Sequence, residues 1–311
     1  MTSRSTSPSE IREYRKLTRA IVMRHLGRPA NRIIYKASGL TNHVFAVNHV
    51  EGQFVIRISP NREKIDSFRK ELWATQKARD AGVPTPEVLH VGNEIAQKPY
   101  MISRLVSGTN ATHHQKRLSI VHKMGSYAAM INSIRTSGFG RSFDWSAEKP
   151  KQSWNDYLDK EWNVHEKIEI LASNKVISKA QLVNLRKEID RSRVAPFEPA
   201  LNHGDLRLKN VLVDEDGQIT AIVDWDDCLS AIAPHWELSI ALHDLTIDEK
   251  HAFISGYGLT NDQIREMALL IKAFNIINYA NAVKDAAVKS AKHLSEFKLR
   301  LQGSLDLYSL C

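Results

Sequence analysis

One short segment in the second half of the chain limits its possible folds more than any other. Asp205 and Asn210 stand five residues apart, and two β-prone runs follow, residues 211–213 and 219–223, with a turn sequence between them. The pattern predicts a β-hairpin, which returns the chain to the edge where it started. Asp224 comes directly after the second run, so we expect it to lie beside Asn210.

Side chains of these types, brought together, have a definite chemistry. Carboxylate and amide oxygens are hard ligands, and two of them that converge on one point suit Mg²⁺. The sequence therefore predicts Asn210 and Asp224 as metal ligands, with Asp205 on the loop beside them. A carboxylate in that place can orient a substrate hydroxyl and accept its proton while the metal neutralises the phosphates of a nucleotide.

The same residues resemble a known family. The string His203-Gly204-Asp205, followed by Asn210 and Asp224, resembles the catalytic and metal-binding segments of the aminoglycoside phosphotransferase and choline kinase family, small-molecule relatives of the protein kinases. The resemblance implies a kinase that moves the γ-phosphoryl group of ATP to a hydroxyl of a small-molecule acceptor. It implies ATP and Mg²⁺ as cofactors, with Asp205 as the catalytic base.

The resemblance also implies an α+β fold of the two-lobed protein-kinase type. Residues 1–105 are expected to form a β-rich N-terminal lobe that binds the nucleotide, with a capped helix packed on it from Pro8 to about His25. Residues 106–311 are expected to form a mainly helical C-terminal lobe for catalysis and acceptor binding. Before a last segment, this lobe is predicted to have helices at 114–134, 154–171, 179–194 and 261–284.

Upstream segments resemble the nucleotide-binding parts of the family, in the family's order. The loop at 37–42 resembles a phosphate-covering loop, and the run at 54–58 resembles the strand whose basic residue grips the phosphates. The helix at 65–79 would supply a carboxylate for that base, and 99–108 resembles the last strand and hinge that meet adenine. The nucleotide-binding residues implied in this way are Ser38, Gly39, Thr41, Arg57, Glu71, Ser103 and Leu105.

Two positions depart from the family pattern. The phosphate loop has only Gly39 where several glycines are usual, so a hydroxyl of Ser38 or Thr41 can stand in for a backbone donor. The strand base is Arg57 instead of lysine. Arginine stays charged and offers a planar fork of donors, but its longer reach changes the geometry toward Glu71 and the phosphates. These departures leave the nucleotide affinity open, but they do not change the predicted type of reaction.

Several neighbours of the motif have expected roles. Arg207 follows the base by two residues, where protein kinases commonly place a phosphate-facing lysine, so it is expected to touch the γ-phosphate. His203 is expected to support the loop by hydrogen bonds, and Glu237 is expected to be structural, in a region where the family often has a bracing aspartate. Asp226 either extends an acidic turn or reaches a second metal. No neighbour of Cys228 would lower its pKa, so a nucleophilic role is not expected.

The acceptor is less constrained than the reaction. Residues 137–140 and the pair Ser153-Trp154 resemble a loop and helix start typical of the antibiotic-kinase branch, which favours an aminoglycoside. Five carboxylates of the next helix would either pair with its ammonium groups or form an ordinary charged surface: Asp156, Asp159, Glu161, Glu166 and Glu169. A metabolic kinase for homoserine, choline, a sugar or a similar alcohol stays open, as does a nucleotide-binding scaffold without activity.

Composition and charge agree with this interpretation. The chain has 311 residues, 42% of them hydrophobic and 25% charged, which is ordinary for a globular protein large enough for two lobes. Two cysteines give no disulfide framework, and no apolar stretch approaches the roughly 18 residues of a membrane span. We therefore expect a cytoplasmic protein with no membrane partner. The net charge of +8 comes from scattered basic residues, so no nucleic-acid partner is expected.

Overall fold

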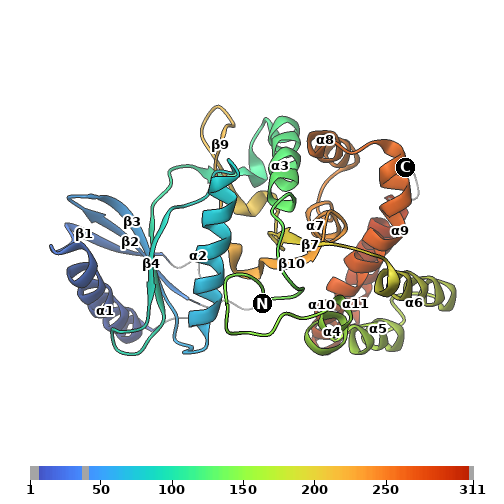
Figure 1. Ribbon diagram of the computed structural model, residues 1–311, viewed down its shortest axis with the longest axis horizontal. Coiled ribbons are helices and arrows are strands. Elements are labelled where there is room, and N and C mark those ends of the chain that lie inside the picture. Colours follow the sequence, from blue (N-terminus) through green and yellow to red (C-terminus); the bar gives the residue numbers. More distant parts are fainter. Residues whose placement is uncertain (1–6, 37–41, 308–311) are drawn as a thin grey trace.

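The chain folds into a strand-rich lobe and a larger, mainly helical lobe (Figure 1). The computed structural model describes residues 7–36 and 42–307. Among the described residues, the strand-rich lobe has five strands and two helices up to the strand at Tyr100–Arg104, and the division at residue 105 stays a prediction. Within the described residues, no helix is both long and apolar enough to cross a membrane.

The first lobe is built on one antiparallel sheet with the strand order β1-β2-β3-β5-β4. Its strands are Arg32–Lys36 (β1), His43–His49 (β2), Gly52–Ile58 (β3), Val88–Gly92 (β4) and Tyr100–Arg104 (β5). Successive side chains of a strand point to opposite faces. In β3, Phe54 and Ile56 are buried in the core on one face, so Arg57 is presented on the other.

Two helices cover the opposite faces of this sheet (Figure 1). Helix α1, Pro8–Leu26, begins at Ser7, whose hydroxyl oxygen accepts a hydrogen bond from the Glu10 N–H at 3.2 Å. It ends at Gly27, which has a left-handed backbone (φ 69°), and the predicted capped helix is thereby confirmed. Helix α2, Lys64–Asp80, lies on the face that carries Arg57 and occupies the predicted helical segment.

Two small sheets frame the loops that carry the predicted site. Their strands are Thr109–Asn110 (β6), Pro199–Asn202 (β7), Val211–Val213 (β8), Ile219–Ile222 (β9) and Leu229–Ile232 (β10). Strands β8 and β9 form the predicted hairpin, and the Val223 N–H donates to the Asn210 carbonyl at 2.9 Å. Strands β7 and β10 pair with Asn202 opposite Leu229, so the loop after β7 starts beside the turn that precedes β10.

Helices make up most of the second lobe. They are Arg117–Asn132 (α3), Trp154–Asp156 (α4), Val164–Ser173 (α5), Lys179–Val194 (α6), His235–Ala241 (α7), Ile247–Tyr257 (α8), Asn261–Asn278 (α9), Ala280–Lys289 (α10) and Ala291–Leu307 (α11). The helix predicted at 179–194 has the observed bounds of α6. The prediction of one helix at 261–284 was wrong, because the chain breaks at Tyr279 between α9 and α10.

The prediction of one continuous helix at 154–171 was also wrong. After α4 the chain makes a π-helical turn, in which the Trp162 N–H donates to the Tyr157 carbonyl at 2.8 Å, and α5 starts only after Asn163. Asn163 has a left-handed backbone (φ 53°), which ends any regular helix. Three aromatic residues before the break pack against Trp236: the ring centres of Trp154, Tyr157 and Trp162 lie 4.9–6.3 Å from the Trp236 ring centre.

Candidate functional site

Asp205 and Asn210 lie together on the loop between β7 and β8. The side-chain amide of Asn210 donates to the backbone carbonyl of Asp205 and to its carboxylate oxygen Oδ2, each at 2.8 Å. Both residues are buried. The two bonds use the amide nitrogen, so the amide oxygen is the atom of Asn210 that remains for a cation.

Two basic side chains meet the Asp205 carboxylate. Arg207 Nε donates to Oδ1 at 2.5 Å, and Lys209 Nζ lies 2.8 Å from Oδ2. Arg207 also lies 3.4 Å from Asp244 Oδ2. Burial opposes the charge of Arg207, but these carboxylates outweigh it and raise the Arg207 pKa. Arg207 therefore contacts Asp205, the predicted base. A phosphate that binds Arg207 has to share the guanidinium with the Asp205 carboxylate.

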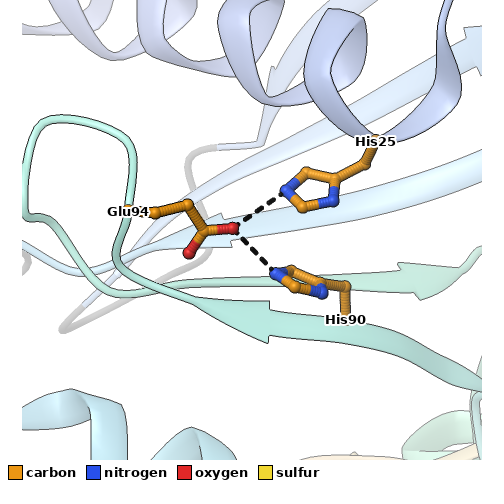
Figure 2. Close-up of side chains that lie close together, drawn as sticks. All are labelled: His25, His90 and Glu94. Atoms are coloured by element: carbon orange, nitrogen blue, oxygen red, sulfur yellow. Dashed lines mark hydrogen bonds and ion pairs between the residues drawn. The ribbon is translucent and has the colours of Figure 1, made fainter.

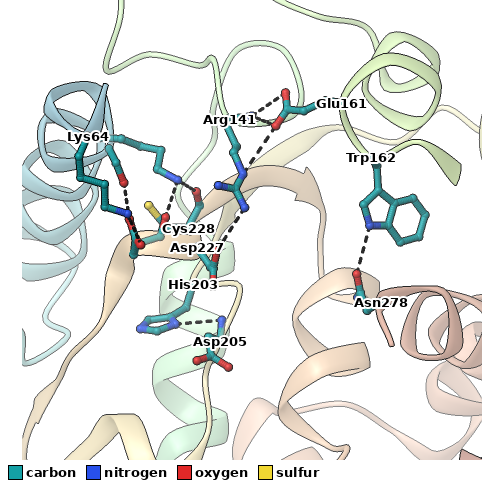
Figure 3. A network of polar contacts seen from close by, with 12 residues as sticks. Lys64, Arg141, Glu161, Trp162, His203, Asp205, Asp227, Cys228 and Asn278 are labelled. Atoms are coloured by element: carbon teal, nitrogen blue, oxygen red, sulfur yellow. Dashed lines mark hydrogen bonds and ion pairs between the residues drawn. The ribbon is translucent and has the colours of Figure 1, made fainter. Parts of the chain in front are cut away.

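His203 supports the loop by hydrogen bonds, and its contact with Asp205 is drawn in Figure 3. Its Nδ1 accepts the backbone N–H of Asp205 at 3.2 Å, and its Nε2 lies 3.1 Å from the Val223 carbonyl. These partners require a neutral ring with the proton on Nε2. Burial lowers the His203 pKa to about 4, so the ring is neutral at pH 7. The expected structural role of His203 agrees with this geometry.

Glu237 in α7 braces the same loop. Its Oε2 accepts the backbone N–H of His203 at 2.5 Å, and the N–H of Gly204 also bonds to this side chain. Glu237 is fully buried, and burial raises its pKa to about 7. Gly204 has φ 77°, and a Cβ there would lie 2.2 Å from the Asp227 carbonyl oxygen. The loop therefore depends on a glycine at 204 and on a buried acceptor beneath it.

Asp224 stands at the end of β9 with a left-handed backbone (φ 66°). Burial raises its pKa, Arg57 opposes the rise, and the carboxylates of Asp205 and Asp226 add to it. A cation among these carboxylates would relieve their repulsion. Carboxylate oxygens and the amide oxygen of Asn210 are ligands that Mg²⁺ prefers, so the donor set fits the predicted ion.

Arg57 and Glu71 join strand β3 to helix α2. The Arg57 guanidinium donates to Glu71 Oε2, and its carbon lies 5.2 Å from the centre of the Phe68 ring. Burial raises the pKa of Glu71, and Arg57 opposes that rise. The pair faces a cavity of about 200 Å³, lined by Val55, Arg57, Glu71, Thr75, Pro86, Val88, Met101, Ser103, Arg104, Leu105, Val106, Leu212, Val223, Asp224 and Trp225.

The predicted hinge residues, Ser103 and Leu105, also line this cavity. Ser103 is paired within the sheet to the strands on both sides of β5. The Leu105 N–H donates to the Gln53 carbonyl at 2.9 Å, so a purine has to use other backbone groups of this segment. The three predicted phosphate-loop residues lie outside the described residues: Ser38, Gly39 and Thr41.

Comparison with known proteins identifies the family to which the chain belongs. A family model described as the phosphotransferase enzyme family matches residues 35–270. The chain belongs to this family. Among curated proteins, the hygromycin-B 4-O-kinase of Escherichia coli is 26% identical over 169 residues. That match covers 53% of this chain and 49% of the relative, so it spans about half the length of the curated protein.

Solved structures confirm the predicted fold. A thermostable mutant of the aminoglycoside phosphotransferase APH(4)-Ia, in complex with AMP-PNP and hygromycin B, superposes with a TM-score of 0.67 at 17% identity, over 93% of this chain and 98% of that one. The GDP and kanamycin complex of APH(2")-IIia gives a TM-score of 0.61 at 13% identity, over 94% and 98% of the two chains. At these identities the likeness establishes the α+β, two-lobed kinase-like architecture.

In this family member, α2 also binds the turn after β9, a contact that the sequence did not predict. Lys64 donates to Asp226 Oδ1 at 2.6 Å, and Ser67 donates to the same oxygen (Lys64 in Figure 3). Lys70 donates to the backbone carbonyls of Asp226 and Cys228 at 2.8 and 2.5 Å. Asp226 is thus engaged by α2, which favours the acidic turn over a second metal. The three donors recur every three residues, a spacing that places them on one helix face.

A second hollow, of about 450 Å³, lies beside the π-helical turn. It is lined by Arg141, Tyr157, Glu161, Trp162, Asn163, Glu166, Lys167 and Asn281. Arg141 joins two carboxylates there: its backbone N–H donates to Glu161 at 3.1 Å, and its Nη2 donates to Asp227 at 3.1 Å (Figure 3). Burial, together with Arg141, lowers the pKa of Lys167 to about 8. The hollow therefore carries charges of both signs.

The five carboxylates predicted near the acceptor all have basic partners within the chain. The ion pairs are Asp156 with Lys160, Asp159 with Arg193, Glu161 with Arg141, Glu166 with Lys284 and Glu169 with Arg186. Only Glu161 and Glu166 line the hollow. For the other three, the arrangement favours the interpretation as a charged surface.

Proposed function

We propose that this protein is a small-molecule kinase that transfers the γ-phosphoryl group of ATP to a hydroxyl group of an aminoglycoside. One observation carries the proposal: Asn210 bonds to Asp205, and Asp224, whose pKa the Asp205 carboxylate helps to raise, lines one cavity together with Arg57 and Glu71. Membership in the phosphotransferase enzyme family supports the reaction. The partial match to a hygromycin-B 4-O-kinase supports the class of acceptor.

Each residue of the site then has a defined part. Asp205 orients the acceptor hydroxyl and accepts its proton. Asn210, through its amide oxygen, and Asp224, through its carboxylate, hold Mg²⁺, which neutralises phosphate charge when it is bound. Arg57, fixed in direction by Glu71, binds nucleotide phosphates with its remaining donors. Catalysis consists mainly of positioning and charge neutralisation, with no covalent enzyme intermediate.

The remaining predicted residues complete this proposal. Arg207 shares its guanidinium between Asp205 and the γ-phosphate. Residues 1–105 form the nucleotide-binding lobe, and residues 106–311 form the lobe for catalysis and the acceptor. Nucleotide contacts other than those of the Arg57 and Glu71 pair come from Ser38, Gly39, Thr41, Ser103 and Leu105. Solved relatives carry AMP-PNP in one case and GDP in another, so both ATP and GTP belong in the first assay.

One observation favours a second candidate for the acceptor. The hollow beside the π-helical turn contains Arg141 and Lys167 as well as Glu161 and Glu166. A polycationic antibiotic gains most from a site with unpaired carboxylates, whereas a neutral or zwitterionic alcohol suits balanced charges. A metabolic kinase for such an alcohol is therefore the alternative to an aminoglycoside kinase.

The decisive experiment measures ADP or GDP release by the purified protein with Mg²⁺ and ATP or GTP. The acceptor panel holds hygromycin B, kanamycin and small metabolic alcohols, and Asp205→Asn is the control. Turnover that an aminoglycoside stimulates and the variant loses supports the proposal. Turnover with the alcohols alone would move the proposal to the metabolic kinase. Bound nucleotide without turnover on any acceptor would favour the scaffold.

A further inference from the structure

Three side chains with metal-binding atoms converge in the first lobe, on the α1 side of the sheet (Figure 2). His25 stands in the last turn of α1, His90 in β4, and Glu94 in the loop after β4. One ligand atom from each residue lies within 4.8 Å of the other two. The proposed kinase reaction uses none of these residues, because the nucleotide cavity is on the opposite face, with Arg57.

The distances within this cluster match those of a zinc shell. Glu94 Oε1 lies 3.3 Å from His25 Nε2 and 3.1 Å from His90 Nε2. Zinc binds histidine nitrogen and carboxylate oxygen at about 2.0–2.2 Å in tetrahedral geometry, which separates neighbouring ligand atoms by roughly 3.3 Å. The two separations from Glu94 therefore fit a tetrahedron, and the ligand atoms of the two histidines lie within 4.8 Å of each other.

Gly92 provides a second, independent observation. A Cβ at this position would lie 2.1 Å from Glu94 Oε2 and 2.7 Å from His90 Nε2. Gly92 is not among the glycines with a positive φ, so its backbone is open to other residues. A side chain at position 92 would therefore displace the Glu94 carboxylate and the His90 ring from their present positions. The space beside Gly92 is occupied by two of the three candidate ligands.

Tyr100 in β5 holds the cluster in place. Its hydroxyl donates to Glu94 Oε1 and lies 2.7 Å from His25 Nε2. The residue is fully buried, and burial raises its pKa well above the ordinary value, so the hydroxyl stays a neutral donor. The contact with His25 Nε2 has to open before that nitrogen can bind a metal, whereas the hydrogen bond to Glu94 can remain, because a carboxylate oxygen has a second lone pair.

We propose that His25, His90 and Glu94 form a zinc site that fastens the end of α1 to β4 and to the loop after it. A water molecule would complete the tetrahedron. Two imidazoles and one carboxylate suit Zn²⁺, whereas Mg²⁺ prefers oxygen ligands alone. The three ligands come from segments 65 and 4 residues apart in the sequence (90 − 25 and 94 − 90), so only the folded lobe presents all of them. Zinc would thus stabilise the folded protein.

The test uses the full chain, stripped with EDTA and then titrated with Zn²⁺ in excess Mg²⁺. The excess Mg²⁺ occupies the catalytic carboxylates and does not compete for imidazole. We expect one zinc ion per wild-type chain and a rise in melting temperature on zinc addition. The matched control is His165→Ala, which removes a histidine with a 79% exposed side chain and should leave both results unchanged.

Three variants decide the proposal. His90→Ala and Glu94→Gln each remove a ligand, and Gly92→Ala keeps all three ligands but inserts a methyl group among them. Each is expected to weaken zinc binding by at least about tenfold and to abolish the zinc-dependent rise in melting temperature. Failure of the wild type to bind one equivalent of zinc would overturn the proposal, as would unchanged zinc binding in His90→Ala and Gly92→Ala. Either result would leave the cluster as a hydrogen-bonded network.

Discussion

Replacement of Glu237 by glutamine would isolate the charge of the side chain that braces the catalytic loop. Glu237 is fully buried and accepts the backbone N–H groups of His203 and Gly204. Burial raises its pKa from 4.5 to about 7 in the folded protein. Glutamine keeps a carbonyl oxygen as acceptor and removes the titration. The variant therefore changes how stability depends on pH more than it changes the contacts.

The sign and size of the effect follow from this pKa. Between pH 4.5 and 7, the folded protein retains a proton on Glu237 that the unfolded chain releases, so this group lowers stability as pH rises. A shift of about 2.5 units at 1.36 kcal/mol per unit corresponds to about 3 kcal/mol. His203 acts oppositely: burial lowers its pKa from 6.5 to about 4, so its contribution is complete above pH 6.5 and is lost toward pH 4. The two trends offset each other in the wild type.

Urea unfolding between pH 4.5 and 7, followed by tryptophan fluorescence, would give the free energy of unfolding of both proteins. We expect the difference, variant minus wild type, to rise by about 1.4 kcal/mol per pH unit, because all other groups cancel. A difference that stays constant across this range would refute the raised pKa of Glu237. Glu237→Ala is the control for the hydrogen bonds. It leaves two buried N–H groups without an acceptor. Its free energy of unfolding should therefore be lower than that of the glutamine variant by about 2–6 kcal/mol at every pH.

Four further substitutions test the proposed site. Asp205→Asn is expected to lower phosphate transfer by at least about 10²-fold with little change in nucleotide affinity, as measured by ADP release and calorimetry. Asp224→Ala removes a metal ligand, so calorimetry should show weaker binding of the nucleotide only when Mg²⁺ is present. Arg57→Lys keeps the charge but loses the fork that meets Glu71, so steady-state kinetics should show a higher KM for the nucleotide. Gly204→Ala forces a side chain against the Asp227 carbonyl at a positive φ and should cost about 2–5 kcal/mol in urea unfolding.

The parts of the structure that could be predicted from the sequence are those with local causes. Hairpin β8–β9 follows from two β-prone runs and a turn, and its register alone brings Asn210 toward Asp224. Helix α1 follows from a serine cap and a closing glycine. The pair of Arg57 and Glu71 is 14 residues apart in the chain, and the resemblance to the family was needed to connect them.

Features with long-range causes escaped prediction. Strands β7 and β10 are short, and each acquires its partner only when the chain returns after about 30 residues. The contact of Lys64 with Asp226 spans 162 positions. The break at Asn163 arises because aromatic rings of this segment pack on Trp236, and helical periodicity carries no information about that partner. The cluster of His25, His90 and Glu94, the proposed zinc site, joins α1 to β4, a strand that the sequence pattern did not reveal.

The contacts of α2 with the turn after β9 have a consequence for the geometry of the proposed site. Hydrogen bonds of Lys64, Ser67 and Lys70 hold the helix that carries Glu71 to the turn that follows Asp224. Pulling the helix away would strip the buried Lys70 ammonium of two carbonyl partners, at a cost of several kcal/mol. The positions of Glu71 and Asp224 are thus linked through one shared set of contacts.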